Sequence, residues 1–326
     1  MRITVLGCGR WGSFHAWYSN HIGHEVTLWG RQTSNRMKQL IETRSNEYLT
    51  LPPEIILTND INEAVNFADV IIISINSQQL RSFVHDLSMI NGIESKKFIL
   101  CMKGLESNSG KRLTEVFTEE FNSEFRIPNF ALNISVWVGP GHVQDFLQGI
   151  PNCMVISSNN KDLTYELVEI FKSPLIRFYY GSDLIGTEIG AAAKNVIGLA
   201  AGMLDGLNYS SLKGALMARG AAELSRLVEA LGGDRMTVYG LSHLGDYEAT
   251  LFSQHSHNRR FGEDFVCNKP FTKLAEGVET VSAIMKLSES LNVELPICKT
   301  VYEIIHNKKD PKDQLLQLFL RSTKEE

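Results

Sequence analysis

The stretch that decides the fold is RITVLGCGRWG, residues 2–12. Residues 3–6 are apolar and are typical of a buried strand, and the glycines that follow have the spacing G-x-G-x-x-G. Residues 11–20 then predict a helix, and residues 26–29 predict a second strand, which is the context of a dinucleotide-binding turn. In such a turn, backbone N–H groups approach a pyrophosphate at the N-terminus of the helix. We therefore favour dinucleotide binding over a glycine-rich turn of some other α/β protein.

Apolar segments continue to alternate with helical patterns up to about residue 180. The segment 69–75 is almost entirely apolar, as expected for a parallel strand that is covered on both faces. Residues 78–90 place apolar side chains at helical spacing. Further strands are predicted at 98–101, 136–138, 154–156 and 176–179. The pattern indicates an α/β fold in which residues 1–180 form a Rossmann-like, doubly wound parallel sheet.

The second half of the chain, residues 181–326, is predicted to be an all-helical substrate-binding domain. Its main feature is DLIGTEIGAAAKNVIGLAAGMLDG, residues 183–206, where a glycine or Lys194 occurs at every fourth position from 186 to 202. Each glycine inside a helix costs about 1 kcal/mol relative to alanine. Either helix packing or a substrate and nicotinamide lying against bare backbone would explain the stripe. Packing alone does not explain a lysine, which in an apolar surface needs a partner or a function.

A second helix is predicted at residues 211–231, and the polar segment 246–270 is predicted to be a loop. Asn195, beside Lys194, is another polar group where apolar ones would pack better. Lys103 closely follows the strand at 98–101. It therefore belongs to the edge of the sheet where the carboxyl ends of parallel strands bind ligands.

Composition narrows the class of protein further. A chain of 326 residues with 43% hydrophobic and 21% charged residues predicts two globular domains. The net charge of −5 argues against nucleic acid or an anionic membrane as the main partner. Five scattered cysteines indicate free thiols in a reducing compartment, and no signal peptide or membrane-spanning run is evident, so we expect a cytoplasmic protein. No metal site is expected, because His255 and His257 lack a third ligand.

The end of the second strand bears on the choice of cofactor. An NAD-preferring site usually carries a carboxylate there for the ribose hydroxyls. This chain has Gly30 and Arg31 instead. Arg31 could face a 2′-phosphate, which favours NADP(H), although it could also be an ordinary surface arginine. We expect NADP(H), NAD(H) or both as cofactors.

Taken together, these segments resemble the NAD(P)-dependent glycerol-3-phosphate dehydrogenases over almost the whole length of the chain. The motifs of the second domain are specific to that family, whereas many enzymes share the glycine turn. The matching pieces are Gly7–Gly12, Leu28–Arg31, Asn46–Leu49, Lys103–Glu106, Gly139-Pro140, Gly186–Asn195, Gly240–Asp246, Ser256–Gly262 and Glu276–Val278.

The resemblance implies reversible hydride transfer between NAD(P)H and dihydroxyacetone phosphate, giving sn-glycerol 3-phosphate for phospholipid synthesis, with a homodimer as one possible assembly. It implies catalytic roles for Lys194, Lys103 and Asp246. Substrate binding is implied for Lys103, Gly139, Lys194, Asp246, Thr250, Ser256, His257 and Asn258. Cofactor binding is implied for Gly7, Gly9, Arg10, Trp11, Gly12, Arg31, Lys103, Val143, Leu274 and Glu276.

Three departures from the family pattern keep alternatives open. His257 stands where the family usually has an arginine that holds the substrate phosphate, and an imidazole is not equivalent to a guanidinium fork. Residues 141–143 are Gly-His-Val where Ser or Thr, an aromatic residue and Ala are usual, and Arg10 replaces a small residue. The alternatives are a related hydroxyacid or sugar-phosphate dehydrogenase and a catalytically silent cofactor-binding regulator. Either Arg259 or Arg260 could also replace the missing arginine.

Overall fold

The computed structural model describes residues 1–125 and 133–322 and contains two compact units. The first comprises residues 1–102 and 113–184, and the second comprises residues 103–112 together with the chain from Ile185 onward. Ten residues that follow the strand at 97–100 therefore belong to the second unit. The single boundary expected near residue 180 did not anticipate this excursion.

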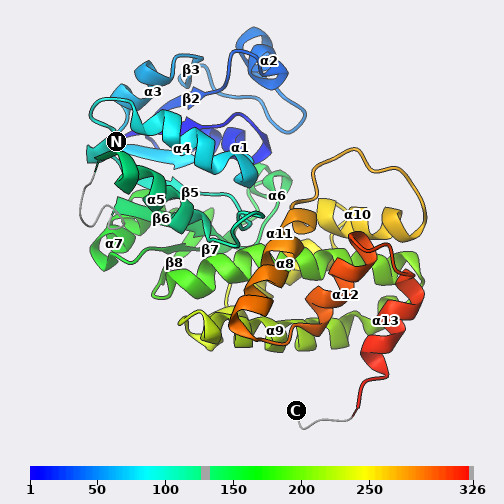
Figure 1. Ribbon diagram of the computed structural model, residues 1–326. Coiled ribbons are helices and arrows are strands. Elements are labelled where there is room, and N and C mark those ends of the chain that lie inside the picture. Colours follow the sequence, from blue (N-terminus) through cyan, green and yellow to red (C-terminus); the bar gives the residue numbers. More distant parts are fainter. Residues whose placement is uncertain (126–132, 323–326) are drawn as a thin grey trace. The chain divides into compact units, whose positions relative to one another are not determined.

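The first unit is built on one eight-stranded sheet with the order β3-β2-β1-β4-β5-β6-β7-β8. All neighbouring strands are parallel except β6 and β7, which pair antiparallel. The first six strands have the order of a dinucleotide-binding sheet. The α/β, Rossmann-like fold predicted for this half is confirmed (Figure 1). The strands are β1 (Arg2–Leu6), β2 (Glu25–Trp29), β3 (Ile56–Thr58), β4 (Val70–Ile73), β5 (Lys97–Leu100), β6 (Ile134–Val138), β7 (Asn152–Ser157) and β8 (Ile176–Gly181).

Helices cover both faces of this sheet, and β4 shows why its sequence is wholly apolar. Val70 and Ile72 pack into the core on one face, whereas Ile71 and Ile73 pack into the core on the other. Side chains of α1, α2, α6 and α7 belong to the first core, and those of α3, α4 and α5 to the second. The helices are α1 (Arg10–His21), α2 (Asn35–Thr43), α3 (Ile61–Phe67), α4 (Leu80–Ser88), α5 (Leu113–Phe125), α6 (Val143–Leu147) and α7 (Lys161–Phe171).

The second unit is helical, as predicted, and its core forms around α8. In the described residues no helix is both long and apolar enough to cross a membrane. The prediction of a loop over residues 246–270 is wrong. This segment contains a π-helical turn at Glu248–Phe252 and a ten-residue helix whose N-terminus is capped by Ser256. The helices are α8 (Leu184–Gly206), α9 (Lys213–Ala230), α10 (His257–Val266), α11 (Glu276–Leu291), α12 (Pro296–Ile305) and α13 (Pro311–Phe319).

The glycines of α8 permit close packing of the protein on itself. A Cβ added at Gly202 would lie 1.8 Å from the carbonyl oxygen of Arg259 in α10, and one at Gly198 would lie 2.8 Å from Cγ2 of Thr250. In return, Gly262 of α10 faces the carbonyl oxygen of Leu199. The interpretation that the stripe exposes bare backbone to substrate and nicotinamide is therefore wrong at these positions, because protein atoms already occupy the space.

Candidate active site

Each of the three glycines in the turn between β1 and α1 has a different structural role. Gly7 has a φ of +118°, and a Cβ there would lie 2.2 Å from the carbonyl oxygen of Ser74. A Cβ at Gly12 would lie 1.8 Å from the carbonyl oxygen of Gly7, so this glycine allows the helix to pack on the turn. At Gly9, by contrast, the nearest atom to a Cβ would be an Arg36 guanidinium nitrogen at 3.7 Å. Only the middle glycine leaves its space open.

The N-terminus of α1 is suited to an anion. Gly9 occupies the N-cap and provides no side-chain hydrogen bond, and no acidic residue lies in the first turn. The first amide groups of a helix have no partners within the helix, and the helix dipole favours negative charge at this end. A pyrophosphate against Gly9 would therefore meet both open space and a favourable field, and the turn fits a dinucleotide.

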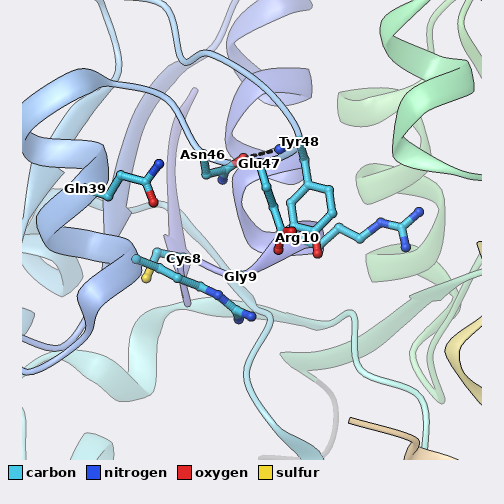
Figure 2. Close-up of a pocket in the computed structure, with 8 residues that line it drawn as sticks. Cys8, Gly9, Arg10, Gln39, Asn46, Glu47 and Tyr48 are labelled. Carbon is cyan, nitrogen blue, oxygen red and sulfur yellow. Dashed lines mark hydrogen bonds between the residues drawn. The ribbon is translucent and has the colours of Figure 1, made fainter. Parts of the chain in front are cut away.

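A cavity of about 280 Å³ lies beside this turn, within the first unit (Figure 2). The guanidinium carbon of Arg10 lies 5.4 Å from the centre of the Tyr48 ring, and Arg10 also donates a hydrogen bond of 2.8 Å to Gln144. Asn46 donates to the hydroxyl of Ser13 at 2.9 Å and so ties the loop that carries Tyr48 to α1. The lining residues are Cys8, Gly9, Arg10, Arg36, Gln39, Asn46, Glu47 and Tyr48.

The other residues predicted to contact the cofactor are placed less uniformly. Trp11 is half-buried and packs edge-on against Phe14, while Arg31 is exposed and is not among the cavity-lining residues. The side chain of Val143 is fully buried in the core, and Leu274 is 52% exposed. Arg36, Asn46 and Tyr48 line the cavity but received no role from the sequence, although two of them lie in a motif that was recognised.

In the second unit, two lysines share one carboxylate oxygen. The Nζ atom of Lys194 lies 2.5 Å from Oδ2 of Asp246, and the Nζ atom of Lys103 lies 2.7 Å from the same oxygen. Lys194 also donates a hydrogen bond of 2.7 Å to the hydroxyl of Thr250. The side chains of Lys194 and Asp246 are only 9% and 2% exposed. All three residues with predicted catalytic roles are thus brought together, and the site has two positive charges for one negative.

Burial sets the protonation of this cluster. It lowers the pKa of Lys194 to about 8, a change that the charge of Lys103 reinforces and that of Asp246 opposes. Burial therefore outweighs the charge of Asp246. Burial also raises the pKa of Glu276 to about 7, although both lysines lower it. Lys194 can therefore both hold and release a proton near neutral pH.

The strap formed by residues 103–112 holds Lys103 in the second unit. Its ends join through an antiparallel bridge between Leu105 and Arg112, and Arg112 forms a 2.7 Å ion pair with Glu188 of α8. Lys286 of α11 donates hydrogen bonds to two carbonyl oxygens at the tip of the strap. This arrangement could not be predicted from local pattern, because Glu188 and Lys286 lie more than 70 positions away from the residues of the strap that they bind.

The residues predicted around the substrate phosphate lie at the start of α10. The Ser256 hydroxyl caps the helix by accepting from the N–H of Arg259, and the side-chain oxygen of Asn258 accepts from the N–H of Gly277 at 2.9 Å. His257 is half-buried at the first position of the helix. The Arg259 guanidinium is bound to Asp205 at 2.7 Å. Arg259 is therefore already committed within the protein.

The side-chain amide of Asn195, which follows Lys194 in the sequence, has a donor without a partner in the part of the chain that the structure describes. The Nδ2 atom of Asn195 is buried and makes no hydrogen bond to any described residue. A buried donor without a partner costs free energy, so it calls for a specific explanation, of which a bound ligand is one. Among residues 1–125 and 133–322, no group of three or more metal-ligating side chains is assembled.

A Rossmann sheet with an open glycine turn, followed by a helical unit that carries a buried lysine of lowered pKa, defines a nicotinamide-dependent dehydrogenase. The comparisons with known proteins identify the family. The model of the NAD-dependent glycerol-3-phosphate dehydrogenase N-terminus matches residues 2–164, and that of its C-terminus matches residues 183–316. The chain belongs to the NAD-dependent glycerol-3-phosphate dehydrogenase family.

Individual relatives agree along the full chain. The glycerol-3-phosphate dehydrogenase [NAD(P)+] of Prosthecochloris aestuarii is 38% identical and is aligned over 100% of both chains. That of Thermoanaerobacter sp. is 34% identical over 100% of this chain and 99% of its own. The crystal structure of glycerol-3-phosphate dehydrogenase from Coxiella burnetii superposes with a TM-score of 0.88 at 26% identity, covering 98% of this chain and 99% of that one.

Proposed function

We propose that this protein catalyses reversible hydride transfer between NAD(P)H and dihydroxyacetone phosphate, forming sn-glycerol 3-phosphate for phospholipid synthesis. The observation that carries the proposal is the buried group of Lys194, Asp246 and Lys103, whose oxygen-to-nitrogen distances are 2.5 and 2.7 Å. Relatives that are 34–38% identical along the whole chain support the same substrate.

Lys194 has the properties required of the proton donor. A bound nicotinamide supplies the hydride, and the carbonyl oxygen of the substrate then develops negative charge. The Lys194 ammonium stabilises this charge and gives its proton to the oxygen, and in the reverse direction the amine takes the proton back. Its pKa of about 8 makes both states accessible near neutral pH. Thr250, through its hydroxyl, and Asp246, through Oδ2, orient the ammonium.

The remaining polar groups suit the rest of the substrate. Lys103 carries a second positive charge on the same carboxylate and would bind a substrate oxygen, while Asn195 offers an unused N–H donor beside the catalytic lysine. His257, Ser256 and Asn258 lie at the start of α10, where the helix dipole favours a phosphate. Arg260 is exposed and forms no ion pair with any residue that the structure describes, so it is the arginine that could assist His257.

The cofactor would be held by the first unit, with its pyrophosphate against Gly9 and the N-terminus of α1. Arg31 and Arg36 are both exposed cations near the end of β2, and no acidic residue follows that strand at once. Cations in this place favour the 2′-phosphate of NADP(H). A cytoplasmic location and a homodimer complete the proposal, the first suggested by five free cysteines.

The deciding experiment is a substrate panel. We expect NADPH, and more weakly NADH, to be oxidised with dihydroxyacetone phosphate and not with phosphate-free ketoacids. Activity with ketoacids alone would select the related hydroxyacid dehydrogenase, which His257 keeps in consideration. Binding of cofactor without activity towards any substrate would select a silent regulator.

A further inference from the structure

His243 and Tyr247, which lie on either side of Asp246 in the sequence, form a hydrogen-bonded pair. Both side chains are fully buried, and the Tyr247 hydroxyl lies 2.6 Å from Nε2 of His243. The other ring nitrogen, Nδ1, lies 2.8 Å from the carbonyl oxygen of Gly190 in α8. Because a carbonyl can only accept, Nδ1 carries the hydrogen, and Nε2 accepts from the tyrosine. The imidazole is therefore neutral, and both of its nitrogens form hydrogen bonds.

The surroundings keep both members of the pair in these states. Burial lowers the pKa of His243 to about 4, against the hydrogen bond to the Gly190 carbonyl, which raises it; the charge of Lys194 also lowers this pKa and that of Asp246 raises it. The imidazole therefore stays neutral and adds no repulsion to Lys194. Burial likewise raises the pKa of Tyr247 well above its usual value, with Cys298, Glu223 and Tyr239 acting in the same direction. The tyrosine therefore stays protonated and remains a donor.

The pair fixes the turn that carries Asp246. The N–H of Asp246 donates to the carbonyl oxygen of His243 at 3.0 Å, and Tyr247 is the next residue along the chain. Asp246 thus lies between the two anchored residues, within the 3₁₀ turn Leu244–Asp246. On the helix side, Gly190 precedes Lys194 by four positions, one turn of α8. His243 therefore links two backbone segments: the turn that carries Asp246 and the turn of α8 that precedes Lys194.

The close approach depends on the absence of a side chain at Gly190. A Cβ there would lie 3.0 Å from Cβ of His243 and 3.1 Å from Oγ of Ser242. Both distances are shorter than ordinary van der Waals contact, so an alanine would push the turn away from α8. This gives one glycine of the stripe a part in placing the turn that carries Asp246.

We propose that His243 and Tyr247 are positioning residues that hold the Asp246 carboxylate against Lys194 and Lys103. The inference rests on the proposed function in so far as the lysine pair performs the reaction. Neither residue touches substrate; they act through Asp246. If the pair is broken, Asp246 gains freedom, its stabilisation of the Lys194 ammonium weakens, and the pKa of Lys194 falls.

Tyr247→Phe is the direct test, because it removes one hydroxyl and leaves the ring. We expect kcat for ketone reduction to fall about tenfold, since small displacements of catalytic groups have large effects on rate. The pKa of Lys194 predicts that the basic limb of the wild-type kcat profile begins near pH 8, and we expect it to move down by about half a pH unit in the variant. His243→Asn, whose amide can still donate towards Gly190, should retain more activity than His243→Leu.

Tyr18→Phe is the matched control. Tyr18 is also fully buried, and its hydroxyl donates a 2.6 Å hydrogen bond to the carbonyl oxygen of Phe171 in the first unit. It should lower the melting temperature to a similar extent and leave kcat and its pH profile unchanged. If Tyr247→Phe behaves in the same way as Tyr18→Phe, the pair is merely structural and the positioning role is refuted.

A second readout separates this inference from the proposed function. If the wild type itself does not reduce dihydroxyacetone phosphate, the proposed function fails, and the pKa of Lys194 can still be measured. Titration of ¹³C-dimethylated lysines by NMR, assigned with Lys194→Arg, reports this pKa without turnover. A lower value in Tyr247→Phe than in the wild type supports positioning, and an equal value overturns it.

Discussion

Two segments of this protein are rich in glycine, residues 7–12 and α8, and their glycines serve different purposes in the fold. In the first, a Cβ at Gly9 would have only the tip of the Arg36 side chain nearby, at 3.7 Å. In the second, a Cβ at Gly202 would meet a backbone oxygen at 1.8 Å. A glycine therefore indicates close approach without indicating what approaches. In the glycine turn the space beside Gly9 is open, whereas in α8 other parts of the protein fill the space beside Gly198 and Gly202.

Lys194→Ala should have the largest effect in either segment. It removes the proton donor and leaves Asp246 paired only with Lys103, so we expect turnover to fall by about a thousandfold or more. Cofactor affinity should survive, because the glycine turn lies in the other unit. Steady-state assays together with NADPH fluorescence titration measure the two quantities. Near-normal turnover in this variant would refute the role of Lys194.

Gly202→Ala tests whether α10 packs directly against the glycines of α8. The new Cβ cannot coexist with the Arg259 carbonyl oxygen, so α10 must shift, and we expect a loss of about 3 kcal/mol in unfolding free energy. Gly214→Ala in α9 is the matched control, since no atom of the described part of the chain lies within 4 Å of its added Cβ. That change should stabilise the protein by up to about 1 kcal/mol. Urea unfolding of both variants gives the comparison, and equal stabilities would contradict it.

The second unit also buries a carboxylic acid, Glu223, whose surroundings differ from those of Lys194. Lys194 has Asp246 as a partner, whereas Glu223 in α9 is held by the backbone N–H groups of Ile297 and Cys298. Burial raises the pKa of Glu223 from 4.5 to about 7. The folded state then binds more protons than the unfolded state between these values, so stability falls as pH rises from about 4.5 to about 7.

Glu223→Gln should remove this part of the pH dependence. The stability difference between variant and wild type, measured by urea unfolding at pH 5 and pH 8, should change by about 2–3 kcal/mol in favour of the variant at pH 8. Glu276 contributes with the same sign but is present in both proteins, so it cancels. A difference that does not change with pH would show that Glu223 is ionised as easily in the folded chain as in the unfolded one.

Gly9→Ala should have the smallest effect on stability and a specific effect on binding. The added methyl group enters open space, so unfolding free energy should change by less than about 1 kcal/mol. It would nevertheless stand where a pyrophosphate must approach, and we expect NADPH affinity to fall about tenfold. Calorimetric titration measures the affinity. Unchanged binding would show that the cofactor does not lie against this glycine.

Much of the fold could be predicted from local pattern. The strand at 69–75 became β4, the helix at 78–90 became α4, and the helix at 183–206 became α8 with bounds within two residues. These elements are long or strongly apolar, and the periodicity of their apolar residues indicates which of their faces are buried. The segment 246–270 was misjudged because some of its polar residues act within the fold: Ser256 caps α10, and Arg259 pairs with Asp205 of α8.

The sequence by itself determined the sheet, the glycine turn and the presence of a lysine that needed a partner, because these follow from spacing along a few neighbouring turns. The resemblance already grouped Asp246 with Lys194 and Lys103. Only the tertiary structure decided that one oxygen of Asp246 serves both lysines and that the His243 ring binds the backbone of α8 at Gly190. These residues come from positions 103, 194, 243 and 246. No local pattern joins them, and the balance between burial and charge that sets the pKa of Lys194 exists only once the chain has brought them together.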